Sequence, residues 1–115
     1  MVRRSKEPAK GTLDLPGGVV DRYESAEDAA HREVKEETGL DIACCRYLCS
    51  IPNLYPYSGF EVHTVDMFFE CLTESFDGAK AEDDAAEIII LPANQLNPDD
   101  FGLQSIKKAV DRYIK

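Results

Sequence analysis

The stretch from Gly18 to Leu40 constrains the fold of this chain more than any other part of the sequence. Its second half predicts a helix, because Ser25 is a suitable N-cap and Asp28 stands three residues later, as in a capping box. Gly39 is a residue type that ends helices in the left-handed conformation. Between these ends the sequence has no proline and few β-branched residues. We therefore expect a helix between Ser25 and Gly39.

Three glutamates occupy an unusual place on this helix. On a helical wheel Glu33 and Glu37 lie in the middle of the small, apolar side, and Glu36 borders it. Residues three and four apart are neighbours on a helix surface, so these like charges repel one another. A solvated charged face is the plain alternative, but such a face already exists on the opposite side. A divalent cation would remove the repulsion, and ligands that are all oxygen favour Mg²⁺ or Mn²⁺ over Zn²⁺.

The same stretch resembles the Nudix box, GX5EX7REUXEEXGU, in which U is a bulky aliphatic residue. Every fixed position is matched, by Gly18, Glu24, Arg32, Glu33, Val34, Glu36, Glu37, Gly39 and Leu40. The resemblance implies an α/β fold, a Nudix-type α/β/α sandwich with a mixed β-sheet between helices. It also implies a metal-dependent pyrophosphohydrolase that uses Mg²⁺ or Mn²⁺.

The resemblance also implies roles for individual residues. Glu33, Glu36 and Glu37 would be the catalytic carboxylates and, with the carbonyl of Gly17, would hold the metal. Glu33 is the first candidate for the general base that activates water. The next candidates are Asp84 and Glu87, which lie in an ExxE-like element, although the acidic run before them is also typical of a solvated loop. Arg32 and Glu24 are expected to brace the junction of loop and helix as a charge-assisted pair.

The segment from Ser50 to Gly59 contains two prolines and two tyrosines. Prolines oppose a central strand, so we expect a loop here. It is either an ordinary loop with aromatic anchors or a substrate wall on which Tyr55 and Tyr57 stack a base. The segment resembles the array SQPWPFPxS of NADH pyrophosphatases, a branch of the Nudix family, with departures at its Gln, Trp and first inner Pro.

The N-terminal residues are basic. Arg3 and Arg4 are either part of a solvated end or help to hold a substrate phosphate, a role that suits arginine. Val2 to Arg4 resembles only the tail of the strand that precedes the box in the family, so the first strand or strands are expected to be missing. The open sheet edge would then be covered by another strand or by a second copy in a homodimer, or the chain is shortened.

The other elements follow from local patterns. We expect strands over 41–50, over 60–72 with both faces buried, and over 88–91 before Pro92. Leu13 and Leu15 alternate as in a short strand. His63 is expected to be a satisfied core residue. From Leu103 onward, apolar residues recur at helical spacing and predict a closing amphipathic helix.

Length and composition limit the functional classes. The chain has 115 residues, which predicts one domain over residues 1–115. Its net charge of −9 argues against non-specific nucleic-acid binding, which depends on lysine and arginine. No apolar run is long enough to span a bilayer, so we expect a cytoplasmic protein without a membrane partner. The four cysteines form no zinc-binding pattern and are expected to be reduced.

The resemblance to the Nudix family implies a small-molecule nucleotide substrate. We expect cleavage of a nucleoside diphosphate linked to another group, such as NADH or ADP-ribose, with release of a nucleoside monophosphate. The alternative is a Nudix-like domain that binds a nucleotide or ADP-ribose without hydrolysing it.

Overall fold

The computed structural model of the chain describes residues 1–82 and 85–115, without the side chains of Tyr55 and Tyr57. Its elements, in chain order, are β1 (Val2–Arg4), β2 (Leu13–Asp14), α1 (Ala26–Thr38), β3 (Cys44–Tyr57), β4 (Phe60–Leu72), β5 (Ala85–Ile88), the 3₁₀ helices η1 (Ala93–Gln95) and η2 (Pro98–Asp100), and α2 (Gln104–Ile114).

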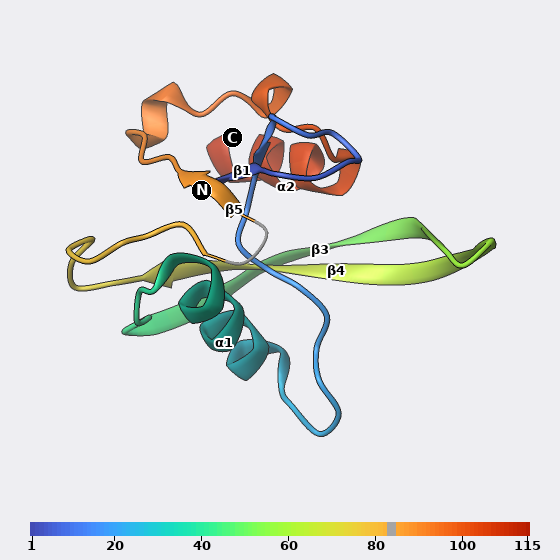
Figure 1. Ribbon diagram of the computed structural model, residues 1–115, viewed down its shortest axis with the longest axis horizontal. Coiled ribbons are helices and arrows are strands. Elements are labelled where there is room, and N and C mark those ends of the chain that lie inside the picture. Colours follow the sequence, from blue (N-terminus) through green and yellow to red (C-terminus); the bar gives the residue numbers. More distant parts are fainter. Residues whose placement is uncertain (83–84) are drawn as a thin grey trace.

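The two helices lie on opposite sides of the long ribbon formed by β3 and β4 (Figure 1). The other three strands form a second sheet, in the order β2-β1-β5, on the side of α2. The α/β class is confirmed. The strand pairing differs from the predicted single mixed sheet. The named strands form two separate sheets, and the pairs within each sheet are antiparallel. A single bridge between Leu13 and Phe101 is parallel.

Helix α1 forms where its capping residues predict it. The hydroxyl of Ser25 accepts a hydrogen bond from the backbone N–H of Asp28 at 3.0 Å. At the other end Gly39 adopts a φ of 74°, and its N–H donates to the carbonyl of Lys35. Such a left-handed residue is favourable only when it lacks a Cβ. The predicted helix is therefore confirmed at both ends.

Strand β3 continues through the segment that we expected to be a loop. Its pairing with β4 runs from Cys44 opposite Leu72 to Tyr57 opposite Phe60, so the prediction of a loop over Ser50–Gly59 is wrong. Among the described residues, β3 has β4 as its only neighbouring strand. An edge strand tolerates proline, because the missing N–H removes no ladder bond on the open side.

Strand β4 forms as predicted, but its two faces are not both buried. Phe60 is 75% exposed and Val65 is 65% exposed. His63 is also exposed, so the prediction of a core histidine is wrong. The reason is that α1 and α2 cover only part of the ribbon, whose far end projects beyond them (Figure 1).

The N-terminal residues form the central strand of the small sheet. β1 pairs with β2 on one side and with β5 on the other, so β1 itself is not an open edge. The last strand lies three residues earlier than expected, at Ala85–Ile88 instead of 88–91. The N-terminal amine and carbonyl of Met1 still hydrogen-bond to Ile89, which extends the pairing by one residue. A homodimer stays a prediction.

The compact core joins the small sheet to α2. Leu13, Phe101 and Val110 form its centre, and Phe101 is the most deeply buried large side chain. Helix α2 begins at Gln104, as its apolar spacing predicts. All four cysteines are free, and they lie on the β3–β4 ribbon. Within the described ranges, no helix has the length and apolar character needed to cross a membrane.

Candidate active site

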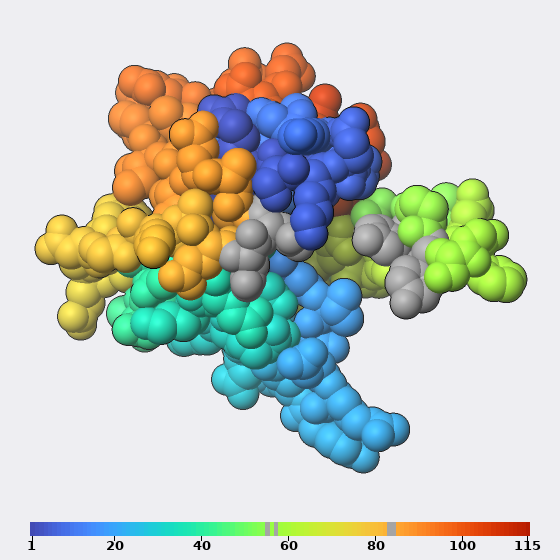
Figure 2. Space-filling view, viewed as in Figure 1, coloured from blue at the N-terminus to red at the C-terminus, as the bar shows by residue number. Residues whose placement is uncertain are grey.

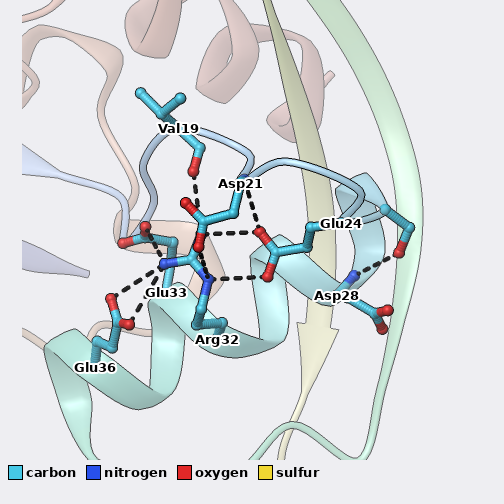
Figure 3. Close-up of polar contacts among 8 residues, drawn as sticks. Val19, Asp21, Glu24, Asp28, Arg32, Glu33 and Glu36 are labelled. Carbon is cyan, nitrogen blue, oxygen red and sulfur yellow. Dashed lines mark hydrogen bonds and ion pairs between the residues drawn. The ribbon is translucent and has the colours of Figure 1, made fainter.

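The guanidinium of Arg32 is the centre of a polar network between α1 and the loop before it (Figure 3). Its Nε and Nη2 donate to the two carboxylate oxygens of Glu24 at 2.9 and 3.0 Å. Nη2 also donates to the carbonyl of Val19 at 3.1 Å. The bonds between Arg32 and Glu24 hold the pKa of the Glu24 carboxyl below its usual range and raise the pKa of Arg32 above its usual value. The predicted charge-assisted pair is present.

The carboxylate of Glu33 is held between Arg32 and Gly18. Its Oε1 accepts a hydrogen bond from Arg32 Nη1 at 2.9 Å, and its side chain is only 15% exposed. A Cβ added to Gly18 would lie 2.4 Å from the same oxygen, so no larger residue fits there without moving Glu33. The sequence alone does not show this contact, because it depends on how the loop and the helix meet.

Glu37 connects the same helix to the glycine pair and to a second segment. Its Oε2 accepts a hydrogen bond from the backbone N–H of Gly17 at 2.7 Å. The carbonyls of Glu37 and Thr38 accept bonds from the backbone N–H groups of Glu82 and Lys80, both at 2.9 Å. Carbonyls at a helix end lack partners inside the helix, so this segment caps α1. The sequence had shown the segment only as an acidic, polar loop.

Glu36 is the most exposed of the three glutamates. Its side chain is 46% exposed and lies 3.3 Å from Arg32 Nη1, which therefore contacts both Glu33 and Glu36. Across the described residues, no three histidine, cysteine, aspartate or glutamate side chains form a group that could hold a metal ion. The long contact to Glu36 is the weaker of the two and leaves that carboxylate accessible to another cation.

The oxygen donors of the three glutamates are of the type that Mg²⁺ or Mn²⁺ binds, but in this structure the described carboxylates do not converge as a metal-binding group. Glu33, Glu36 and Glu37 come from consecutive turns of one helix face, and Gly17 is joined to them by the bond to Glu37. Carboxylate and carbonyl oxygens are hard ligands, which both ions prefer. The carbonyl of Gly17 stays a predicted ligand.

Nearly the whole chain matches a known domain family. The family model described as the NUDIX domain matches residues 1–113. The chain belongs to the Nudix family. Its Nudix box is the stretch from Gly18 to Leu40, which contains the network around Arg32.

Similar proteins in this family carry different names. The ADP-ribose pyrophosphatase of Methanocaldococcus jannaschii is 33% identical over 98% of this chain and 65% of its own length. A putative 8-oxo-dGTP diphosphatase of Bacillus subtilis is 67% identical over 37% of this chain and 27% of its own length. The crystal structure of a Nudix hydrolase from Nitrosomonas europaea has the same fold, with a TM-score of 0.69 and 17% identity over 98% of this chain and 60% of its own. This Nudix chain thus spans about two thirds or less of these relatives.

The side chain of Arg4 makes structural contacts within the Nudix domain. Its Nη1 donates to Asp14 at 2.6 Å and its Nε donates to the carbonyl of Pro8 at 2.7 Å. Both charged side chains of this pair are mostly buried, and burial raises the pKa of Asp14 although Arg4 opposes the rise. The pair ties β1 to the loop that follows it and to β2, so a substrate phosphate would have to compete for the guanidinium.

The remaining candidates are not brought to α1 by any described contact. Glu87 lies on β5, where its carboxylate pairs with Arg3 across the small sheet. Asp84 lies outside the described residues. Tyr55 and Tyr57 are on the end of β3 that projects from the body, but their side chains also lie outside the described part. Their roles in base binding stay predictions.

Proposed function

We propose that the chain is a metal-dependent pyrophosphohydrolase. Its substrate is a nucleoside diphosphate linked to another group, with ADP-ribose as the first candidate and NADH as the next. Water attacks one phosphorus, and the products are a nucleoside monophosphate and the phosphorylated remainder. ADP-ribose comes first because the relative that matches nearly the whole chain is named for it.

The observation that carries this proposal is the helix face of α1 against the glycine pair. Glu33 accepts a hydrogen bond from Arg32 and lies close to Gly18, and Glu37 accepts one from the N–H of Gly17. These bonds support the proposal, because they restrict both carboxylates in the absence of substrate and so lower the cost of ordering them around a metal ion.

The residues divide the chemistry between them. Glu33, Glu36, Glu37 and the carbonyl of Gly17 would hold Mg²⁺ or Mn²⁺. The bound ion would neutralise the pyrophosphate oxygens and lower the pKa of the attacking water. Glu33 is our first candidate for the base that accepts the proton of water. Of the two glutamates of α1 that contact Arg32, its side chain is less exposed than that of Glu36.

A cation is also required by the charge of the chain. The net charge of −9 repels a polyphosphate, and the basic side chains Arg3 and Arg4 are already paired with Glu87 and Asp14. Binding of an anionic substrate beside three glutamates would therefore be weak without divalent ions. We expect both binding and hydrolysis to depend on them.

The test is hydrolysis by the purified chain. ADP-ribose, NADH and 8-oxo-dGTP are each incubated with Mg²⁺ or Mn²⁺, and the products are separated by ion-exchange chromatography. We expect a nucleoside monophosphate from at least one substrate, and none when EDTA removes the metal. A folded chain that releases no product from any of them would contradict the proposal.

The matched variants are Glu37→Gln and Glu27→Gln on the same helix. Glu27 lies in the first turn of α1 and is exposed, so its loss should leave turnover within about twofold. Glu37→Gln keeps the side-chain shape and should remove most metal-dependent turnover while the circular dichroism spectrum is unchanged. Equal turnover by the two variants would refute the metal-ligand role of Glu37.

One observation favours the alternative of a nucleotide-binding domain without hydrolysis. Arg32 contacts both Glu33 and Glu36, so two of the three carboxylates already have a cationic partner. Calorimetry distinguishes the two functions. Metal-independent binding of ADP-ribose with no product after prolonged incubation would support the binding domain.

A further inference from the structure

A tight turn stands immediately before α1, at residues 21–24. The backbone N–H of Glu24 donates to the carbonyl of Asp21 at 3.1 Å, and the N–H of Asp21 donates back to Glu24 Oε1 at 2.9 Å. Glu24 also accepts two hydrogen bonds from Arg32. The turn is therefore fixed to the helix at its base, and Arg22 and Tyr23 form its tip.

Tyr23 occupies a position in this turn that favours glycine. Its φ is +64°, in the left-handed region, where a Cβ is unfavourable. A positive φ at the third residue of a turn is typical of Gly or Asn. The side chain is 98% exposed, so burial does not compensate for the backbone conformation. Unfavourable backbone conformations of this kind cluster at ligand-binding and active sites.

The aromatic ring of Tyr23 is exposed to solvent and has a cation over one of its faces. The Arg22 guanidinium carbon lies 5.7 Å from the centre of the ring, within the range of a cation–π interaction. The loop that carries both side chains projects from the body of the molecule, in light blue (Figure 2). The opposite face of the ring, with the positive charge of Arg22 close by, suits a planar ring that belongs to an anionic molecule.

The tip is joined directly to the candidate active site. Asp21 Oδ2 lies 3.4 Å from Arg32 Nε, and Nη1 of the same guanidinium donates to Glu33 at 2.9 Å. One side chain thus links the turn to the carboxylate that we propose as the base (Figure 3). A substrate whose pyrophosphate lies at Glu33 would extend its remaining parts across the neighbouring surface, which includes this turn.

We propose that Tyr23 and Arg22 form a stacking platform for the nucleobase of the substrate. The proposal rests on the proposed function for its substrate class, but it concerns binding and not bond cleavage. The base stacks on the phenol ring, a contact that every base can make and that purines make with the larger area. Arg22 contributes positive charge at the point where a strongly acidic chain must accept an anion.

The first experiment uses fluorescence, because the chain contains no tryptophan. Tyr23→Trp introduces a single indole at the tip, and Phe76→Trp, at an exposed residue of another loop, is the control. The probes are AMP, which has a base, and ribose 5-phosphate, which has none, both with Mg²⁺ present. We expect saturable quenching of Tyr23→Trp by AMP alone and no change in Phe76→Trp. Equal responses of the two variants, or equal responses to the two probes, would overturn the proposal.

The second experiment uses Tyr23→Gly, for which the stability and the affinity should change in opposite directions. Glycine accepts the positive φ, so the midpoint of urea unfolding should rise. The dissociation constant for AMP, measured by calorimetry, should also rise, on the order of tenfold, since one stacked base is lost. Where the chain hydrolyses ADP-ribose, KM should rise by a similar factor while kcat stays within twofold.

The outcomes separate this proposal from the proposed function. Quenching by AMP without hydrolysis of any substrate would refute the hydrolase and keep the platform. Hydrolysis with an unchanged KM in Tyr23→Gly would keep the hydrolase and refute the platform. A change in oligomeric state on size-exclusion chromatography, with unchanged AMP affinity, would also refute it and would make the tip a contact between copies of the chain.

Discussion

Substitution of Gly18 by alanine tests whether the position of the Glu33 carboxylate matters. The change adds one methyl group and removes no functional group. The added Cβ would lie 2.4 Å from Glu33 Oε1 and 2.6 Å from its Cδ, about 1 Å short of the 3.4 Å of an ordinary contact. The carboxylate must move by roughly that amount, and we expect its 2.9 Å bond to Arg32 to lengthen or break.

Two magnitudes follow from this displacement. Loss of one partly buried, charge-assisted hydrogen bond should lower the free energy of unfolding by about 1 kcal/mol. A misplacement of about 1 Å at a reacting group lowers turnover by about a hundredfold. We therefore expect Gly18→Ala to be folded, slightly less stable and nearly inactive.

Gly17→Ala is the matched control. A Cβ on Gly17 meets nothing within 4 Å, and its φ is outside the left-handed region. Its backbone N–H, which donates to Glu37, and its carbonyl are both retained. Urea unfolding followed by circular dichroism gives the stability, and initial rates of ADP-ribose hydrolysis give the activity. Turnover numbers of Gly18→Ala and Gly17→Ala within twofold of each other would show that the position of the Glu33 carboxylate does not control the activity.

Three further predictions concern other parts of the chain. Arg32→Lys removes the paired bonds to the loop before α1 and should lower the midpoint of urea unfolding; an unchanged midpoint would contradict the bracing role of Arg32. The hydrogen bond from Tyr113 is the main cause that lowers the pKa of Glu70 from its ordinary 4.5. The ionised Glu70 therefore stabilises the fold above pH 4.5, and this stabilisation is lost as the pH falls through the lowered pKa. Tyr113→Phe should therefore flatten the loss of Tm below pH 4.5, and an unaltered pH profile of Tm would count against the contact. Burial raises the pKa of Cys71 to about 11, whereas Cys44 is exposed, so iodoacetamide at pH 8 should label Cys44 first in peptide mass spectra; earlier labelling of Cys71 would show that the thiol is accessible.

The β3–β4 ribbon shows where local patterns were insufficient. Pro52 and Pro56 predicted a loop, and the apolar residues of β4 predicted a strand buried on both faces. Whether a proline breaks a strand depends on which side its missing N–H would face, and burial depends on which helix covers the strand. Both are set by neighbours that are distant in sequence, so a reading of one segment cannot decide them.

The sequence by itself determined helix α1 and the spacing of its carboxylates. The helix caps and the carboxylate spacing depend on interactions within a few residues, so they form in any tertiary context in which the segment is helical. They involve Ser25, Gly39, Glu33 and Glu37.

Only the tertiary structure decided how this helix is joined to the rest of the chain. It placed Glu33 against Gly18, which lies fifteen residues away, and committed Arg4 to Asp14 instead of leaving it for a phosphate. Such contacts arise where a loop and a sheet meet the helix, and their energies depend on the packing of the whole domain.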